Sequence, residues 1–233
     1  MRGSQRRPVR FAAVALALLA APAAGQEAGG REAARETAII ETIELPDARR
    51  DGPLSLEAAL EARRSRRRFG ERALRLDEIA QLFWAAQGRT RPGRRTAPSA
   101  GALYPLEIYA ATRQGLYHYR GEDHSALLRR QPFLRDSLFA ASRRQEALRA
   151  PPAVFVIAGV PARSAAKYGA RAERYTWLEA GHAAQNLLLQ AVALGLDAVP
   201  VGAFRDDAVA AALRLPPGEK PLYLIPVGCR AEP

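Results

Sequence analysis

The sequence has very few of the residues that build disulfides and metal centres. Its single cysteine, Cys229, cannot form an intrachain disulfide or a thiolate zinc site. Three histidines, His118, His124 and His182, are too few and too widely spaced to indicate a metal centre by themselves. We therefore expect no metal. A chain of 233 residues with 48% hydrophobic residues is long enough to fold around an ordinary hydrophobic core.

Lysine is almost absent, although the chain is basic. Only Lys167 and Lys220 are lysines, so 33 of the 35 basic residues are arginines, and the formal net charge is +11. A basic surface favours anionic partners such as phosphates, nucleic acids or lipid headgroups, but it does not determine a fold. No nucleic-acid-binding motif accompanies the arginines, so we expect no nucleic-acid partner. A basic anion- or nucleic-acid-binding domain is the alternative that the charge leaves open.

Long apolar runs are also missing after the N-terminus, so we expect no transmembrane helix and no membrane anchor. At the N-terminus, the basic residues 1–10 precede an apolar, alanine-rich run over 11–24. This order is typical of a secretory signal peptide, here residues 1–25, and predicts a secreted or periplasmic protein. The pair Arg6-Arg7 indicates the twin-arginine route.

The rest of the chain divides into two parts. Residues 26–53 are polar and punctuated by glycine and proline, and we expect a tether and extended lead-in there. Residues 54–233 are expected to form one folded domain.

Hydrophobic periodicity predicts a mixture of helices and strands without a regular βαβ rhythm. The expected fold class is therefore α+β, with a sheet covered by helices. Pro226 in the last expected strand suggests either an edge strand or the end of a strand. The expected helices span 56–62, 77–87, 123–130, 132–142, 176–195 and 206–213, and the expected strands span 107–112, 116–119, 153–160 and 222–227.

Three segments could carry chemistry, and each also has an ordinary structural explanation. The cluster Arg63–Arg68 places guanidinium groups and the Ser65 hydroxyl together, which suits a phosphate, but it is also typical of a solvated basic patch. The small residues of 97–105 let a backbone approach a flat ligand, or they form a plain turn. Residues 195–204 present backbone N–H groups, or they form a loop after a helix.

Six motifs in this order resemble the nitroreductase superfamily of flavin mononucleotide (FMN) enzymes, and most closely its SagB-type, or thiazoline-oxidase-like, dehydrogenases. The resemblance covers about residues 45–229. The motifs are ARRSRRRF (62–69), LFWAAQG (82–88), APSAGALYPLEIY (97–109), LYHY (116–119), EAGHAAQNLLLQAVALGLDAVPVGAF (179–204) and LYLIPVG (222–228).

This resemblance implies an intertwined homodimer of α+β subunits, each with a central mixed or antiparallel sheet flanked by helices, and two FMN sites at the interface. By this resemblance, Arg63 and Ser65 contact the FMN phosphate and ribityl chain, and Arg67 lies beside the pyrimidine edge of the flavin. The loop over the flavin comes from the other subunit, and backbone groups face flavin N5 and O4. The implied cofactor-binding residues are Arg63, Arg64, Ser65, Arg67, Pro98, Ser99, Gly101, Pro200, Val201, Gly202, Ala203 and Arg230.

The resemblance also implies an acid/base pair, Lys167 and Tyr168, near the flavin. A surface lysine and a packing tyrosine are the ordinary explanation of the same two residues. The implied activity is hydride transfer through flavin N5 in a ping-pong cycle with a small organic substrate. NAD(P)H is scarce outside the cytoplasm, so the electron donor is left open. An FMN carrier or sensor without turnover and a flavin-remodelling enzyme are the alternatives.

Overall fold

The computed structural model describes residues 40–231 of the chain. These residues form a seven-stranded sheet in the order β1-β6-β5-β4-β7-β9-β8, in which every pair of neighbouring strands is antiparallel. A separate two-stranded hairpin consists of β2 (Arg89–Arg91) and β3 (Arg94–Arg95). The strands of the sheet are β1 (Ile40–Glu44), β4 (Leu106–Thr112), β5 (Leu116–Arg120), β6 (Ser125–Arg129), β7 (Ala153–Gly159), β8 (Leu196–Ala198) and β9 (Lys220–Cys229).

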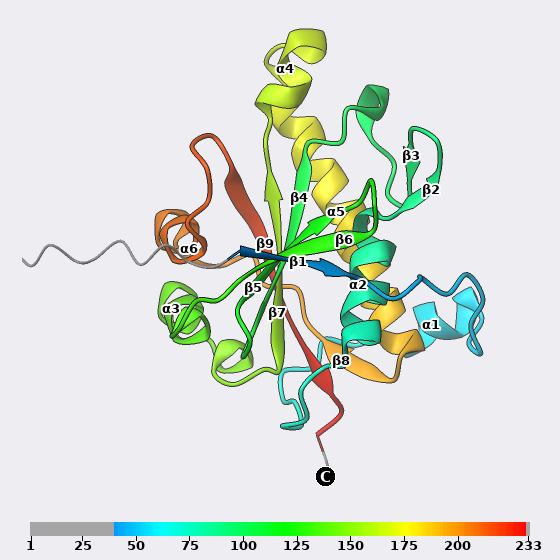
Figure 1. Ribbon diagram of the computed structural model, residues 1–233, viewed down its shortest axis with the longest axis vertical. Coiled ribbons are helices and arrows are strands. Elements are labelled where there is room, and N and C mark those ends of the chain that lie inside the picture. Colours follow the sequence, from blue (N-terminus) through cyan, green and yellow to red (C-terminus); the bar gives the residue numbers. More distant parts are fainter. Residues whose placement is uncertain (1–39, 232–233) are drawn as a thin grey trace, which may run out of the picture. The chain divides into compact units, whose positions relative to one another are not determined.

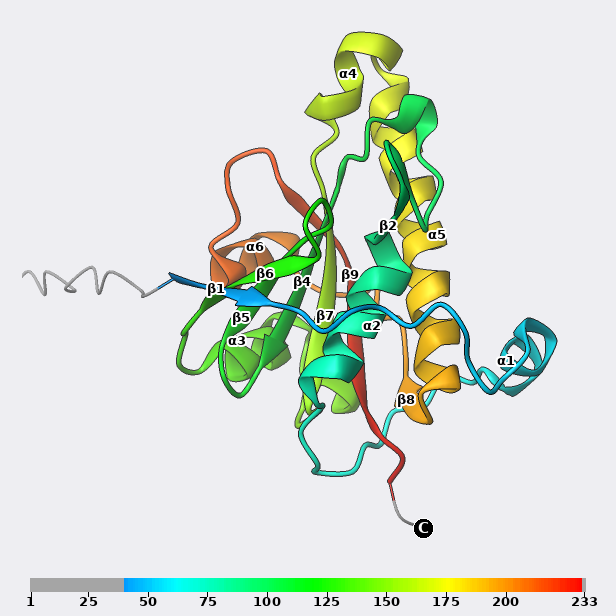
Figure 2. The same ribbon diagram turned by 45° about the vertical axis from the view of Figure 1, so that its right-hand side comes forward.

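Helices cover both faces of this sheet, which confirms the predicted fold class (Figure 1 and Figure 2). On one face α2 and α5 pack with the larger hydrophobic core, and on the other face α3 and α6 enclose a second core. The helices are α1 (Leu56–Ala62), α2 (Leu76–Gln87), α3 (Leu134–Ala141), α4 (Ala162–Tyr168), α5 (Arg171–Ala193) and α6 (Asp206–Leu213).

Strand β7 divides its side chains between the two cores. Phe155 and Ile157 belong to the core under α2 and α5, while Val154 and Val156 belong to the core under α3 and α6. Side chains of a strand point alternately to opposite faces, so a strand in the middle of a three-layer fold must be apolar throughout. This confirms the buried strand predicted from residues 153–160.

The helix predicted over residues 123–130 is wrong, because this segment forms β6. Its residues pair with β5 on one side and with β1 on the other. His124 has a φ of +51° and helps to form the turn from β5 into β6. A short apolar run does not distinguish a helix from a strand, and here the two neighbouring strands decide between them.

Neither the edge strand nor the strand end predicted from Pro226 is found, because β9 lies between β7 and β8 and continues to Cys229. Proline has no N–H group to donate to a neighbouring strand. The chain after β8 keeps its register with β9, from Ala198 opposite Val227 to Val201 opposite Leu224. Between these two pairs, the Pro226 carbonyl accepts the Val199 N–H at 3.4 Å, and no N–H is returned.

The lead-in contributes to the sheet, since β1 pairs with β6 at the sheet edge. The folded part therefore begins by residue 40, ahead of the start expected at residue 54. The signal peptide expected at residues 1–25 and the first part of the tether lie outside the described residues. Within residues 40–231, no helix is long and apolar enough to cross a membrane.

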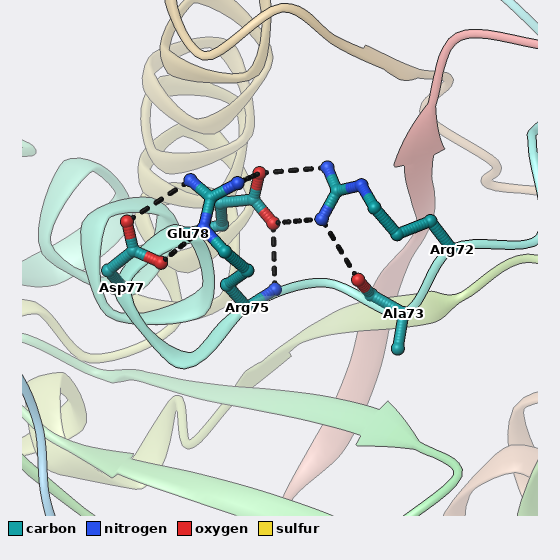
Figure 3. A network of polar contacts seen from close by, with 5 residues as sticks. All are labelled: Arg72, Ala73, Arg75, Asp77 and Glu78. Atoms are coloured by element: carbon teal, nitrogen blue, oxygen red, sulfur yellow. Dashed lines mark hydrogen bonds and ion pairs between the residues drawn. The ribbon is translucent and has the colours of Figure 1, made fainter.

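Ion pairs at the start of α2 fix the segment that leads into it (Figure 3). The Glu78 carboxylate is only 2% exposed and accepts two hydrogen bonds from Arg72, at 2.9 and 3.0 Å. It also accepts the Arg75 backbone N–H at 2.7 Å and pairs with the Arg75 guanidinium at 3.0 Å. Arg72 donates to the Ala73 carbonyl, and Arg75 donates to Asp77. One buried carboxylate thus ties the chain after the arginine cluster to the core.

The Glu78→Gln substitution removes the charge that both arginines face, and we expect it to lower the free energy of unfolding by about 2 kcal/mol. Asp77→Asn breaks an exposed ion pair of the same network and should cost less than about 1 kcal/mol. Urea unfolding of both variants measures the difference. Equal losses would contradict the central role of Glu78.

Candidate functional site

The arginine cluster lies against the ends of β8 and β9. After α1 ends, the Arg66 N–H donates to the Ala198 carbonyl at 3.1 Å. Further along, Phe69 forms a bridge with Arg230, and the Gly70 N–H donates to the Cys229 carbonyl at 2.9 Å. The cluster therefore crosses the C-terminal strand in an extended conformation instead of continuing α1.

This crossing forms a cavity of about 560 Å³ lined by four arginines. The lining brings together three predicted residues, Ser65, Arg67 and Arg230, and adds Arg66, Arg68, Asp197 and Ala231. Within the described part of the chain, none of the four guanidinium groups forms an ion pair with a carboxylate. A hydroxyl and several uncompensated guanidinium groups form a donor set that suits a phosphate.

Two predicted residues lie outside this lining. The Arg64 guanidinium donates to the Glu61 and Arg63 carbonyls at the end of α1, so it caps that helix instead of facing the cavity. Arg63 is the C-cap residue that follows α1, and its backbone N–H donates to the Ala59 carbonyl. Consecutive residues from Ser65 to Arg68 all line the cavity, so the side chains of this segment do not simply alternate between the cavity and solvent.

The segment after β8 offers fewer backbone donors than the sequence predicted. Pro200 has no N–H, and the Val201 N–H donates to the Leu224 carbonyl at 2.8 Å, so the sheet uses it. Gly202 and Ala203 are exposed, and their N–H groups have no acceptor among the described residues. These two groups remain available to a ligand.

The small-residue loop lies at another place, against α5. Ser99 Oγ accepts the Tyr104 N–H at 2.8 Å, and Glu179 of α5 accepts the Ala100 N–H at 2.9 Å. Gly101, in the short 3₁₀ turn η1 (Ala100–Ala102), has a φ of +63°. The loop that contains Pro98, Ser99 and Gly101 is thus held by side chains and by a left-handed backbone.

The structure brings this loop to the predicted acid/base pair. A Cβ atom at Gly101 would lie 2.8 Å from Tyr168 Oη and 3.0 Å from Lys167 Nζ. Both residues end α4, and the Tyr168 ring packs edge-on against Tyr175 of α5 with ring centroids 5.0 Å apart. Lys167 is exposed. A residue other than glycine at position 101 would have an unfavourable φ, and its Cβ would press against the ends of the Lys167 and Tyr168 side chains.

Glu179 is a residue of this region that the sequence analysis did not single out. It is 3% exposed, and its Oε2 atom has no hydrogen-bond partner among the described residues. Burial raises the pKa of the carboxyl, and hydrogen bonds from Ala100 and Ser99 lower it only in part. In the sequence, Glu179 could have been noticed as a charged residue next to Ala180 and Gly181, in a helix with many apolar positions. Glu179 therefore anchors the loop, and its buried surroundings raise the pKa of its carboxyl.

The two groups of residues lie toward opposite ends of α5 (Figure 1). The loop and the Lys167-Tyr168 pair are at its N-terminal part, while β8 and the arginine-lined cavity follow its C-terminus. A helix of 23 residues is about 34 Å long. A single chain therefore does not bring the predicted phosphate contacts and the predicted flavin loop together.

Comparison with known proteins shows the same fold and related sequences. The sequence profile described as the nitroreductase family matches residues 60–229. A relative from Methanocaldococcus jannaschii, provisionally named a nitroreductase, is 39% identical over 197 residues, or 82% of this chain and 97% of the relative. A similarly named solved structure from Ralstonia eutropha has a TM-score of 0.75 and 29% identity, and the match covers 82% of this chain and 90% of that one.

A further solved structure, from Desulfovibrio desulfuricans and named in the same provisional way, contains FMN. Its TM-score is 0.59 at 23% identity, and the match covers 78% of this chain and 88% of that chain. At this identity the likeness shows a shared fold and nothing further.

The Gly101→Ala substitution should displace the loop from the Lys167-Tyr168 pair, because the new methyl group meets both side chains and the φ is unfavourable. We expect a loss of about 1–3 kcal/mol in the free energy of unfolding. Gly195→Ala is the matched control, since Gly195 has a φ of +70° but nothing within 4 Å of its Cβ position. Denaturant titrations that give equal losses would show that the contact with the pair is unimportant.

The Glu179→Gln substitution should stabilise the fold increasingly as the pH rises above about 4.3, the ordinary pKa of a glutamate. The raised pKa of Glu179 means that its favourable contribution is present at low pH and is lost as the pH rises through the folded-state pKa. Glutamine stays neutral, so the difference between variant and parent should grow with pH. Glu173→Gln, on the exposed side of α5, is the control. A difference that does not change with pH would contradict this assignment.

Proposed function

Because the chain belongs to the nitroreductase family of FMN-dependent oxidoreductases, we propose that it transfers hydride between FMN and a small organic substrate in a ping-pong cycle. The observation that carries the proposal is the arginine-lined cavity at the end of β8. The chain that leaves β8 beside this cavity carries the N–H groups of Gly202 and Ala203, which have no acceptor among the described residues. About 13 Å of extended chain separates Ala198 from Gly202, a span that suits a cofactor with a phosphate at one end and a flat ring at the other.

The residues of the cavity fit the FMN phosphate, and FMN supplies the redox chemistry of the reaction when it is bound. Ser65, Arg66 and Arg230 would hold the phosphate, and Gly202 and Ala203 would donate to the edge of the ring. Arg67 would face the negative charge that a reduced flavin carries and would thereby favour reduction. Within the described residues these arginines have no carboxylate partner, so a bound anion would supply the missing charge.

A second copy of the chain would complete the site. Two antiparallel α5 helices would place the small-residue loop of one subunit beside the arginine-lined cavity of the other. Exposed apolar side chains on α1 and α5 support this arrangement: Leu56 and Leu60 are 60% and 50% exposed, and Trp177 and Leu178 are 59% and 57% exposed. Such side chains on two packed helices are typical of a surface that is covered by a partner.

The Lys167-Tyr168 pair would then approach the flavin from the partner subunit and move protons to or from the substrate. Its contact with Gly101 supports this role, because the loop that Gly101 belongs to is the one implied to lie over the flavin. We assign the chain to the SagB-type branch on this pair and on the six motifs. Export through the residues 1–25 stays a prediction, and the electron donor stays open.

The Arg67→Ala variant should bind FMN about 10- to 100-fold more weakly than the parent, because one charge-assisted contact is lost. Flavin absorbance and fluorescence of the purified protein spanning residues 26–233 measure this affinity. Arg64→Ala is the matched control and should bind FMN as the parent does, since Arg64 caps α1. A parent protein that is colourless and takes up no added FMN would contradict the cofactor site.

An FMN carrier without turnover makes a different prediction for the acid/base pair. For an enzyme, Lys167→Ala and Tyr168→Phe should retain the flavin and lose steady-state turnover by at least about tenfold. Retention of full turnover in both variants would remove the catalytic role from the pair.

A further inference from the structure

A second cationic cavity adjoins the small-residue loop. Its volume is about 550 Å³, and its lining includes Pro98 and Ser99 of the loop together with Arg91, Arg94 and Arg95 of the β2–β3 hairpin. The remaining lining residues are two threonines and Tyr104, and none of the lining residues is acidic. The cavity therefore offers several hydrogen-bond donors and a positive charge beside the loop implied to face the flavin.

The hairpin holds like charges directly opposite each other. Arg91 pairs with Arg94, and Arg89 pairs with Arg95, across the two strands. Like charges at opposed positions destabilise a hairpin. Within the described residues Arg91 and Arg94 form no ion pair, whereas Arg95 pairs with Glu122 at 2.7 Å. Arg91 also borders a neighbouring cavity, but it pairs directly with none of the acidic residues described in that lining, Asp47, Glu122 and Asp123. A bound anion would relieve the repulsion between the opposed Arg91 and Arg94.

Contacts with Tyr104 make the hairpin and the loop one structural unit. The Arg95 guanidinium lies 4.9 Å from the centroid of the Tyr104 ring, and the Arg95 N–H donates to Tyr104 Oη at 3.2 Å. The same hydroxyl donates to the Gly93 carbonyl in the hairpin turn, and the Tyr104 N–H donates to Ser99 Oγ. The hairpin that carries Arg91 and Arg94 is therefore held in place relative to Ser99.

We propose that Arg91 and Arg94 bind the anionic group, a carboxylate or a phosphate, of the substrate that reacts at the flavin. The proposal rests on the proposed function, because it takes the Pro98–Gly101 loop to face the flavin. Guanidinium groups bind both anions through paired N–H donors, and the Ser99 hydroxyl adds a further donor. The two threonine hydroxyls donate to the Arg94 and Trp84 carbonyls instead. The hairpin is thus a specificity element for charged substrates.

Reoxidation of the dithionite-reduced enzyme by 4-nitrobenzoate and by its neutral isostere 4-nitrobenzamide tests the proposal. In the Arg91→Gln/Arg94→Gln variant, the second-order rate constant with 4-nitrobenzoate should fall about 10- to 100-fold. The rate constant with 4-nitrobenzamide should change less than about twofold. Arg113→Gln, an exposed arginine in the β4–β5 turn, is the matched control and should change neither rate. Equal rates for the double variant and the parent with 4-nitrobenzoate would count against a carboxylate.

Reduction of the oxidised enzyme by NADPH and NADH distinguishes a phosphate-bearing donor from a carboxylate-bearing acceptor. A loss in the double variant that is confined to NADPH would assign the hairpin to the additional phosphate of the donor. A loss confined to 4-nitrobenzoate would assign it to the acceptor. The proposal is overturned if the double variant matches the parent in both half-reactions.

Binding without turnover separates this proposal from the proposed function. Calorimetric titration of the parent should show that benzoate binds and that benzamide binds more weakly, and the double variant should lose this preference. A protein that shows the preference but does not react with 4-nitrobenzamide would contradict the proposed function and support the anion site. A protein that reacts with 4-nitrobenzamide but shows no preference for benzoate would support the proposed function and contradict the anion site. If the double variant does not fold, the single substitutions Arg91→Gln and Arg94→Gln serve in its place.

Discussion

The length of α5 is the constraint on which the rest of the site depends. This helix spans Arg171–Ala193, and from Ala180 onward its buried residues pack with α2 and the sheet. Glu179 fixes the small-residue loop near its N-terminal part, and β8 begins just after its C-terminus and carries the arginine cluster through Ala198. The rigid helix keeps these two groups apart in one chain, and our proposal of a shared site between two chains follows from that separation.

Buried carboxylates hold both groups in place. Glu78 joins the segment after the arginine cluster to α2, and Glu179 joins the Ser99–Ala100 backbone to α5. Their surroundings differ: Glu78 faces two guanidinium groups, whereas Glu179 faces a backbone N–H and has an oxygen atom without a partner among the described residues. A charged anchor and a carboxyl with a raised pKa thus support the two parts of one proposed site.

Local patterns in the sequence predicted the elements whose surroundings are uniform. The all-apolar run at 153–160 and the helix over 206–213 were predicted correctly, because burial on both faces and helical spacing are visible in the residues themselves. Strand β6 and the interior position of Pro226 depend on which strands lie alongside, and the sequence of a segment does not contain that information. The site shows the same limit. The resemblance named Ser65, Arg67 and Arg230 as cofactor contacts, and the structure places all three around one cavity. It did not predict that Arg64 turns back onto α1.

Subunit complementation tests the shared site most directly. Arg67→Ala damages the cavity of its own chain, and Gly101→Ala damages the loop that would cover the flavin of the partner. If two chains build each site, refolding an equimolar mixture of the two variants gives mixed dimers with one intact site and one doubly damaged site. Random pairing then predicts about a quarter of an FMN per chain, well above either variant alone. FMN content equal to the average of the separate variants would contradict the account.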